Sequence, residues 1–408
     1  MEYEFFKEEL DNGLTVLVEP RPERKVVATN LRVEGGSMNE DMEKKGMMHL
    51  LEHLIFGSSE SRSGKKDIMS KGGWQNASVN HVNTKFYGEI SEKYSMNLIS
   101  DLINTAFHSK LENLERDKKI VIEEEKKSRD SSSGISIRNL GKILYKNGSL
   151  LSTYDIEKSP GHGINPITQE EIEKKYKKIF HPNNASISIV GPVEKEKVIE
   201  KINEMTSNLE KKKKPKRNRL IPKKNSEKLI ETEKDIKTCY VYLGALVPGY
   251  DYESEEYWDL NVILSLLDSS AGGILYERLR EERGIVYSVD SGKISTEETS
   301  SFLIDFHCSP ENLEEALDVT KKSLTDLKEL KDEDLDLIKR QEIEGRKLNR
   351  DKLFKEASKL TWFYSRGALD YLNRYEEEIN SVTPERIRRT AERYLDPENF
   401  KISIVKPK

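Results

Sequence analysis

Two segments of the chain, 215 positions apart, repeat one pattern of residues. Residues 164–192 read INPITQEEIEKKYKKIFHPNNASISIVGP and residues 379–407 read INSVTPERIRRTAERYLDPENFKISIVKP, so both ends share one offset (379 − 164 = 215 and 407 − 192 = 215) and twelve of the 29 aligned positions are identical. Each copy predicts a helix capped by a threonine, Thr168 or Thr383, followed by a proline-containing turn and a β-branched strand. An ungapped match of this quality indicates the tandem duplication of one domain.

The duplication divides the chain near its middle. Between the copies lies a segment rich in Lys, Arg and Pro, residues 209–225, which is typical of a solvated linker. We therefore expect domain one at residues 1–208 and domain two at 226–408. Early strands are predicted at 26–33 and 239–247, each followed by a helical stretch. Strands and helices alternate irregularly in both halves, which favours α+β domains, each a mixed, mainly antiparallel sheet covered by helices.

Charge and composition argue against several classes of protein. The 408 residues carry 68 Lys and Arg against 73 Asp and Glu, a net charge of −5, so a generally basic nucleic-acid-binding protein is not expected. No apolar run is long enough to cross a bilayer, and the N-terminal residues lack the pattern of a secretory signal, so we expect no membrane association. Cys239 and Cys308 are too few for a disulfide framework and fit a reducing cytoplasm.

One apolar helix carries residues that could hold a metal ion. Residues 46–57 read GMMHLLEHLIFG, in which His49 and His53 share a helical face with Glu52 beside it. The other positions are mostly apolar, which predicts a buried helix, where imidazoles and a carboxylate need compensation. Zinc provides it, because zinc binds neutral imidazole nitrogens and leaves a glutamate to hold water. The order H-x-x-E-H is that of inverted zinc peptidases; the alternative is two core histidines hydrogen-bonded to Glu52.

A catalytic zinc usually takes a third protein ligand, and the charged helix predicted at 111–130 offers three glutamates. The 3.6-residue period favours Glu124, which lies on the face expected to meet the core. Glu125, one step round the helix, and Glu123, off that face, remain alternatives on spacing alone. Asp117 shares the face of Glu124 and is a candidate for orienting a ligand from the second shell.

These residues resemble the pitrilysin–insulysin–mitochondrial processing peptidase family of zinc metallopeptidases. Residues 46–57 are similar to the family segment G-x-x-H-x-x-E-H-x-x-F-x-[GS], with the phenylalanine at Phe56. The family's third ligand ends a segment of two apolar residues, two further residues and glutamate, and residues 120–124 match it, which favours Glu124. The spacing from His53 to Glu124 is 71 (124 − 53), a few residues shorter than usual, which we interpret as a loop deletion.

The resemblance implies a zinc endopeptidase with one Zn²⁺ per chain. His49, His53 and Glu124 would hold the metal, which lowers the pKa of bound water towards about 7. Glu52 would accept the proton of this water as general base and pass it to the leaving amine. The second half contains no H-x-x-E-H, so we expect a single zinc site.

Two further segments are similar to family motifs that contact the substrate. Asn76-Ala77 resembles the start of the family's N-A-x-T strand, an edge strand that pairs with the extended peptide backbone, although Val79 stands where the family often has threonine. Residues 272–289 resemble the segment L-R-E-x-x-G-[LI]-x-Y-S. This match implies that Arg280 and Tyr287 contact the substrate and stabilise the oxyanion.

The resemblance covers essentially the whole chain and also implies an assembly. Larger relatives are single chains of four such domains that close around a chamber, whereas this sequence has two. A homodimer would complete the chamber and take short or unfolded peptides, with Arg280 and Tyr287 of one chain serving the zinc of the other. The alternatives are a peptidase that needs an inactive homologous partner chain, and a non-catalytic scaffold subunit, although such subunits usually lose the zinc residues retained here.

Overall fold

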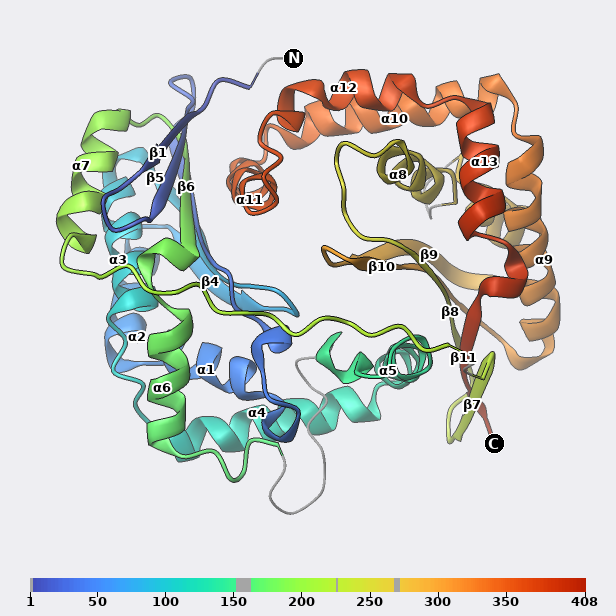
Figure 1. The fold of residues 1–408 in the computed structure, drawn as a ribbon, viewed down its shortest axis with the longest axis horizontal. Coiled ribbons are helices and arrows are strands. Elements are labelled where there is room, and N and C mark those ends of the chain that lie inside the picture. The colour runs from blue at the N-terminus through green and yellow to red at the C-terminus, as the bar shows by residue number, and fades with distance from the viewer. Residues whose placement is uncertain (1–2, 152–162, 225–226, 268–271) are drawn as a thin grey trace. The chain divides into compact units, whose positions relative to one another are not determined.

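The computed structural model describes residues 3–151, 163–224, 227–267 and 272–408. They form two compact units, each built around one β-sheet (Figure 1). Unit 1 draws on residues 1–126, 150–218 and 347–373, and unit 2 draws on residues 127–149, 219–346 and 374–408. Among the described residues, no helix is both long and apolar enough to cross a bilayer.

Unit 1 contains a six-stranded sheet in the order β1-β2-β6-β3-β5-β4. All neighbours are antiparallel except β2 and β6, which run parallel. Its strands are β1 (Phe6–Glu9), β2 (Thr15–Pro20), β3 (Val26–Val33), β4 (Trp74–Val79), β5 (Thr84–Ser91) and β6 (Ala185–Gly191). Its helices are α1 (Met47–Phe56), α2 (Ser59–Ser70), α3 (Ser95–Phe107), most of α4 (Leu114–Asp130), α6 (Gln169–Ile179), α7 (Lys195–Thr206) and α11 (Leu353–Tyr364).

Unit 2 contains a five-stranded sheet in the order β7-β11-β8-β10-β9. Its strands are β7 (Leu229–Lys234), β8 (Cys239–Pro248), β9 (Val286–Ser295), β10 (Thr299–Cys308) and β11 (Lys401–Pro407). Its helices are α5 (Ser132–Leu144), α8 (Glu255–Leu267), α9 (Leu313–Asp326), most of α10 (Asp332–Asn349), most of α12 (Tyr371–Ser381) and α13 (Pro384–Tyr394). A short π-helical turn, Tyr276–Glu281, precedes β9.

The two sheets repeat one topology, so the predicted duplication and the α+β class are confirmed. Strands β7, β11, β8, β10 and β9 follow the order and pairing directions of β2, β6, β3, β5 and β4. The repeated segments form α6 and β6 in one unit, α13 and β11 in the other. Thr168 and Thr383 cap these helices, each accepting a hydrogen bond from a backbone N–H in the first turn. In the turn between the paired strands β1 and β2, Gly13 adopts the left-handed φ of +81°.

The compact units differ from the contiguous domains expected at 1–208 and 226–408, because each takes one helix from the other half of the sequence. Helix α11 lies on the sheet of unit 1, and α5 lies on the sheet of unit 2 (Figure 1). The two helices are equivalent in the duplication, since each follows a long charged helix, α4 or α10, within which the boundary between units falls. The spacing of apolar residues indicates that a helix packs on a sheet, but it does not indicate which of two similar sheets the helix covers.

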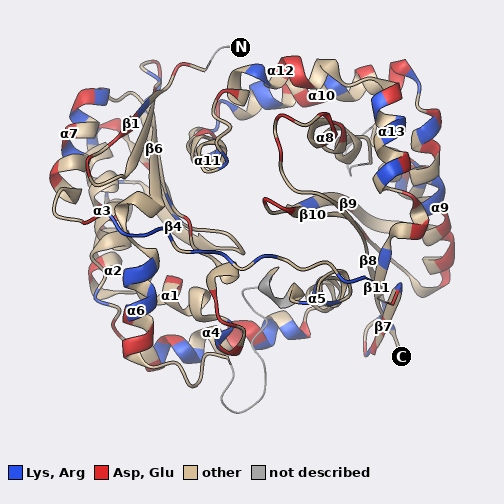
Figure 2. Cartoon of the chain, in the orientation of Figure 1, with Lys and Arg blue, Asp and Glu red and all other residues tan. Residues whose placement is uncertain are grey.

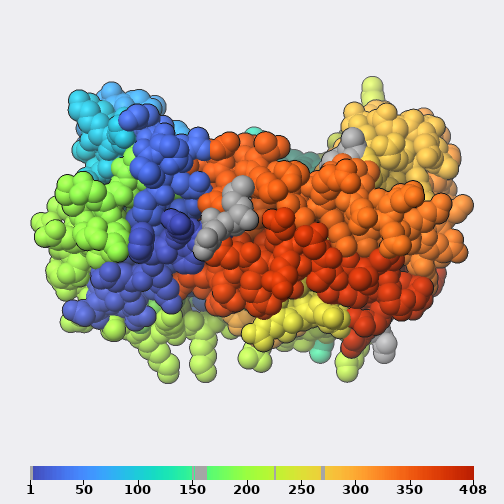
Figure 3. Space-filling view, turned by 90° about the horizontal axis from the view of Figure 1, so that it is seen from above, coloured from blue at the N-terminus to red at the C-terminus, as the bar shows by residue number. Residues whose placement is uncertain are grey.

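Helix α11 packs on the face of the first sheet opposite the main hydrophobic core. That core contains Val27 and Leu31 of β3 together with α1, α3, α6 and α7. On the other face, Asn30 donates from Nδ2 to Ser358 Oγ over 2.9 Å, and Ser188 donates from Oγ to the carbonyl of Ala357 over 2.6 Å. Figure 3 shows the first strands, in blue, beside the orange atoms of this segment. Unit 1 is therefore incomplete without residues from the second half.

The described part of the basic segment, residues 209–224, is extended and largely blue in Figure 2, and most of its side chains are exposed. Side-chain amides hold its first part against unit 1. Asn183 bonds to both backbone groups of Lys212, and Asn218 donates from Nδ2 to the carbonyl of Glu40 over 2.7 Å. Most of the segment faces solvent, as a linker would, and these bonds hold it to unit 1 at Lys212 and Asn218.

Candidate metal centre

Helix α1 positions two histidines at the border between the core and a cavity. Met48, Leu50, Leu51 and Leu54 are fully buried, so the helix is fixed by apolar contacts on most of its surface. His49 is buried and His53 half-buried, and both rings lie one turn apart on the remaining face. The helix ends where the Gly57 N–H bonds back to the carbonyl of His53.

The start of α1 is held by a buried carboxylate that the sequence did not reveal. Glu40 is fully buried and accepts hydrogen bonds from the backbone N–H of Met48 (2.7 Å) and of Gly46 (3.1 Å). Lys45, also buried, places its Nζ 3.1 Å from Glu40 Oε2. Burial raises the pKa of Glu40, while Lys45 and the two N–H groups favour its ionised form. Glu40 thus replaces the missing side-chain cap at Gly46, whose φ of +88° suits glycine.

Removing this cap should loosen the histidine helix. We expect Glu40→Ala to lower the free energy of unfolding by about 3 kcal/mol, because Lys45 would be left as a buried unpaired charge. The affinity for zinc should fall together with the stability, because the start of α1 holds the helix that positions His49 and His53. Urea unfolding and zinc titration measure both effects, with Glu43→Gln, an exposed neighbour, as the control. Unchanged stability in Glu40→Ala would contradict this role.

Helix α4 brings one glutamate to the two histidines. Val121 of this helix is fully buried. Glu124 is half-buried, and its Oε2 lies 3.3 Å from His49 Nε2 and 3.5 Å from His53 Nε2. Glu123 is exposed and pairs with Lys126 at 2.6 Å, whereas Glu125 is buried and does not join the cluster. The geometry therefore favours Glu124 over the two alternatives that spacing left open.

The three side chains form a donor set suited to zinc. The Nε2 atoms of His49 and His53 are 3.2 Å apart, and among the described residues these two and Glu124 are the one group of histidine, cysteine and carboxylate side chains close enough to share an ion. Burial and the neighbouring His53 lower the pKa of His49 to about 3, so its ring is neutral at physiological pH. Two imidazoles and one carboxylate leave a position for water, as in catalytic zinc sites.

Glu52 lies beside this cluster without belonging to it. Its Oε2 is 3.9 Å from His53 Nε2, and its side chain is largely buried at the wall of the cavity. Burial, together with the negative charge of Glu124, raises the pKa of Glu52 to about 7. A carboxylate with this pKa is suited to accept and return a proton near neutral pH.

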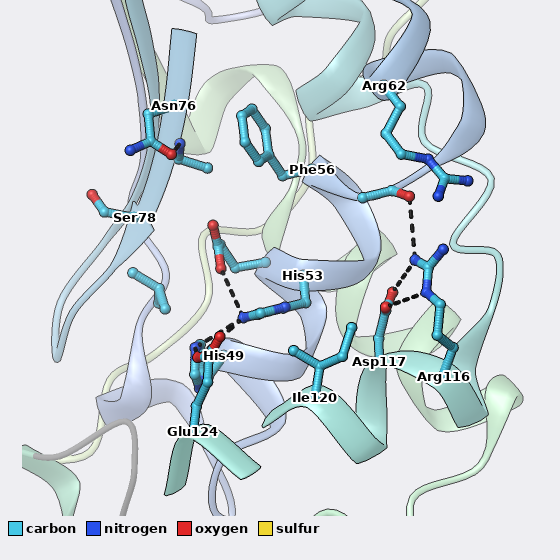
Figure 4. Close-up of a pocket in the computed structure, with 14 residues that line it drawn as sticks. His49, His53, Phe56, Arg62, Asn76, Ser78, Arg116, Asp117, Ile120 and Glu124 are labelled. Atoms are coloured by element: carbon cyan, nitrogen blue, oxygen red, sulfur yellow. Dashed lines mark hydrogen bonds and ion pairs between the residues drawn. The ribbon is translucent and has the colours of Figure 1, made fainter. Parts of the chain in front are cut away.

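A cavity of about 480 Å³ opens in front of the cluster, and the edge of the sheet forms one of its walls (Figure 4). It is lined by His49, Glu52, His53, Phe56, Gly57, Arg62, Asn76, Ala77, Ser78, Val79, Arg116, Asp117, Ile120 and Glu124. Strand β4 is the last strand of the sheet, as predicted. Along an antiparallel strand pair, residues alternate between those that bond to the partner strand and those whose N–H and C=O point away from it. Asn80 N bonds to Asn83 O, so counting back along β4 places the backbone groups of Val79 and Ala77 on the side away from β5. Ala77 N–H donates to its neighbour, to Asn76 Oδ1 over 2.9 Å.

Asp117, expected to orient a metal ligand, pairs with its neighbour Arg116. Its carboxylate receives two bonds from Arg116, from Nε at 2.7 Å and from Nη2 at 3.0 Å, and contacts no zinc-cluster residue among the described hydrogen bonds. Arg116 also donates to the carbonyl of Gly57 over 3.3 Å. Asp117 thus fixes an arginine that bridges α4 to the end of α1, and its role in orienting a ligand stays a prediction.

Arg280 and Tyr287 belong to unit 2, and the other predicted site residues belong to unit 1. Tyr287 is the second residue of the edge strand β9 and is 65% exposed, so it is not a core tyrosine. Arg280 is also exposed, and its guanidinium lies 5.3 Å from the ring centre of Tyr276. Both side chains are therefore accessible to a molecule in solution.

The three glutamates of α4 allow a test of the third ligand. We expect Glu124→Gln to reduce zinc content strongly, because a neutral amide is a poor replacement for a carboxylate ligand. Glu123→Gln, on the same helix and exposed, should retain about one zinc per chain. Glu125→Gln should retain zinc as well, at some cost in stability from its burial. Metal analysis after dialysis measures all three, and zinc loss in Glu125→Gln alone would reverse the assignment.

Comparison with known proteins shows which family this chain is similar to. Residues 15–154 match the family described as Insulinase (Peptidase family M16), and residues 166–342 match the description Peptidase M16 inactive domain. The zinc protease YmxG of Bacillus subtilis (strain 168), itself described as uncharacterized, is 25% identical over 414 residues, 97% of each chain. The zinc protease PqqE of Helicobacter pylori (strain ATCC 700392 / 26695) is 26% identical over 327 residues, 76% of this chain and 71% of that one.

The fold is also found among solved structures. The crystal structure of a protease from Helicobacter pylori superimposes with a TM-score of 0.87 at 21% identity, covering 99% of this chain and 100% of that one. At this identity the likeness concerns the fold alone. The agreement of both sheets with one complete chain supports the order of elements described above.

Proposed function

Because the chain belongs to the insulinase family of M16 peptidases, we propose that it is a zinc endopeptidase that cleaves extended peptides. The observation that carries the proposal is the meeting of His49, His53 and Glu124, with Glu52 beside them, in a cavity bounded by an open strand edge. Two of its relatives are named zinc proteases, which supports the proposal.

The chain's own residues account for the steps of hydrolysis. Zinc, when bound by the two histidines and Glu124, would supply Lewis acidity that polarises the scissile carbonyl and acidifies water. Glu52 accepts the proton of the attacking water and passes it to the leaving nitrogen, for which its pKa of about 7 is suited. Arg280 and Tyr287 donate hydrogen bonds to the developing oxyanion.

The substrate backbone lies along β4. Ala77 and Val79 offer outward N–H and C=O groups, so a peptide can add as a further strand of the sheet. Asn76 adds a side chain at the same wall of the cavity. This mode of binding depends on backbone atoms, so it selects extended peptides or unfolded segments rather than folded proteins.

A purified chain tests the proposal directly. It should hold about one zinc and cleave a quenched peptide, and a chelator should stop cleavage until zinc is restored. The control is His108→Ala, which changes an exposed histidine outside the cavity and should leave both properties intact. A zinc-loaded chain that cleaves only after a homologous chain is added would favour the heteromeric alternative, and one that never cleaves would favour a scaffold.

We further infer a homodimer in which Arg280 and Tyr287 of one protomer act at the zinc of its partner. Mixing Glu52→Gln chains with Tyr287→Phe chains should then raise activity well above the sum of the separate variants. A mixed dimer would combine an intact zinc site from one chain with an intact Arg/Tyr pair from the other. Subunit exchange is verified by tagged pull-down, and sedimentation gives the oligomeric state. An active monomer, or no recovery despite exchange, would contradict the shared site.

A further inference from the structure

One part of the cavity is positively charged and has no role in the chemistry described above. Away from the zinc cluster, Phe56 and Ile120 line the cavity, and beyond them lie Arg62 of α2 and Arg116 of α4 (Figure 4). In the close-up, Arg62 and Arg116 come from different helices and approach the same region beside the end of α1. The metal cluster and the arginines thus line a single space.

The two arginines differ in how their charge is balanced. Arg116 is neutralised by its two bonds to buried Asp117 and is held in place by Gly57. Arg62 is exposed, and its guanidinium forms no ion pair or hydrogen bond with any described side chain. A guanidinium that lines a cavity and keeps its donors available is suited to a carboxylate.

Other charges nearby do not cancel Arg62. Lys65, one turn further along α2, lies 4.9 Å from the ring centre of Phe56 and adds a second cation at this wall. Glu60 of the same helix is paired with Lys110, and Glu112 accepts a hydrogen bond from Ser59. This end of the cavity is therefore net positive, whereas Glu52 and Glu124 place negative charge at the other end.

We propose that Arg62 selects substrates carrying a carboxylate next to the scissile bond. The inference rests on the proposed peptidase function and adds a substrate class to it. A peptide laid along β4 directs a side chain past Phe56 and Ile120, and an acidic side chain would end at Arg62. The carboxylate could instead be the free C-terminus of a short peptide, which has the same chemistry.

Paired peptide series distinguish these sources. The first series of quenched peptides carries Glu, Gln or Lys at the residue before the cleaved bond, and the second series carries them at the residue after it. All of these peptides have amidated C-termini and are otherwise identical. We expect kcat/KM at one of these positions to be about fivefold to tenfold higher for Glu than for Gln, and lowest for Lys. A matching set with free C-termini shows whether a terminal carboxylate is favoured instead.

Charge variants on α2 assign the preference to one residue. Arg62→Gln should bring the Glu-to-Gln ratio of kcat/KM close to one, and Arg62→Glu should favour Lys peptides. Lys66→Gln removes the same charge from an exposed site on the same helix that does not line the cavity, and should keep the preference. Binding of uncleaved Glu and Gln peptides to the Glu52→Gln chain, followed by fluorescence anisotropy, provides a readout without catalysis.

The outcomes separate the two proposals. Cleavage of all peptides at equal rates would overturn the role of Arg62 and leave the peptidase function standing. A preference retained in Arg62→Gln would assign it to another residue and equally overturn the inference. Failure of the zinc-loaded chain to cleave any peptide would instead contradict the peptidase function.

Discussion

Glu52→Gln is expected to keep its zinc and lose cleavage by a factor of about 10² to 10⁴, the usual contribution of a general base. Glutamine has nearly the same shape, so the buried side chain is replaced without a cavity, but it cannot accept the proton of the attacking water. The ligand atoms belong to His49, His53 and Glu124, so metal binding should persist.

Metal analysis and steady-state kinetics on the same preparation measure both properties. His49→Ala is the contrasting variant, because it removes a ligand and should lose metal and activity together. Glu23→Gln, an exposed glutamate outside the cavity, is the matched control and should behave as the parent chain. Full activity in Glu52→Gln would show that the proton is accepted elsewhere.

The second large effect concerns folding. A fragment of residues 1–208 is expected not to fold, although it contains the whole predicted zinc domain, because it lacks α11. That helix buries Leu353, Leu360 and Phe363, each of which contributes about 2 kcal/mol. The sum, about 6 kcal/mol, is comparable with the net stability of a domain, about 5 to 15 kcal/mol. The fragment would also expose one face of its sheet.

Co-expression provides the control for this fragment. Residues 209–408 supplied as a separate chain contain α11, so the two fragments together should give a soluble, folded complex. Circular dichroism and a urea transition compare the fragment, the complex and the intact chain. A cooperative transition in residues 1–208 alone, with parent-like midpoint, would mean that α11 contributes little.

Much of the fold follows from local patterns in the sequence. The predicted strands at 26–33 and 239–247 and the helix before residue 57 appear with nearly the same bounds, because each is set by its own residues. The threonine caps are equally local. The duplicated strand order follows from the repeat, since similar sequences fold in similar ways.

The site was predicted where chemistry and spacing coincide on one helix. The spacing on α1 alone was sufficient for His49, Glu52 and His53. Spacing and the family resemblance favoured Glu124 but did not exclude Glu125, because the angle between α1 and α4 is not set by local spacing. The pairing of Asp117 with Arg116 was not predicted either, because a helical face does not say which neighbouring side chain a carboxylate contacts.

Three features carried no recognisable signal. Glu40 lies six residues before Gly46 in an irregular loop, so no periodic pattern identifies it as a cap. Arg62 sits among polar residues of α2, where an arginine usually faces solvent. The exchange of α5 and α11 depends on long-range packing between parts of the chain that are far apart in sequence.

The exchange of α5 and α11 bears on how such chains can diversify. A gene segment that encodes only the first half would encode the sheet of unit 1 without α11, which covers one of its faces. It would also encode α5, which packs on the sheet of unit 2. Recombination at the midpoint between relatives would therefore join mismatched surfaces on both sheets at once. After the duplication, the two halves could vary only as an interdependent pair, and compensating substitutions should be found between α11 and β3, and between α5 and β8, rather than within either half.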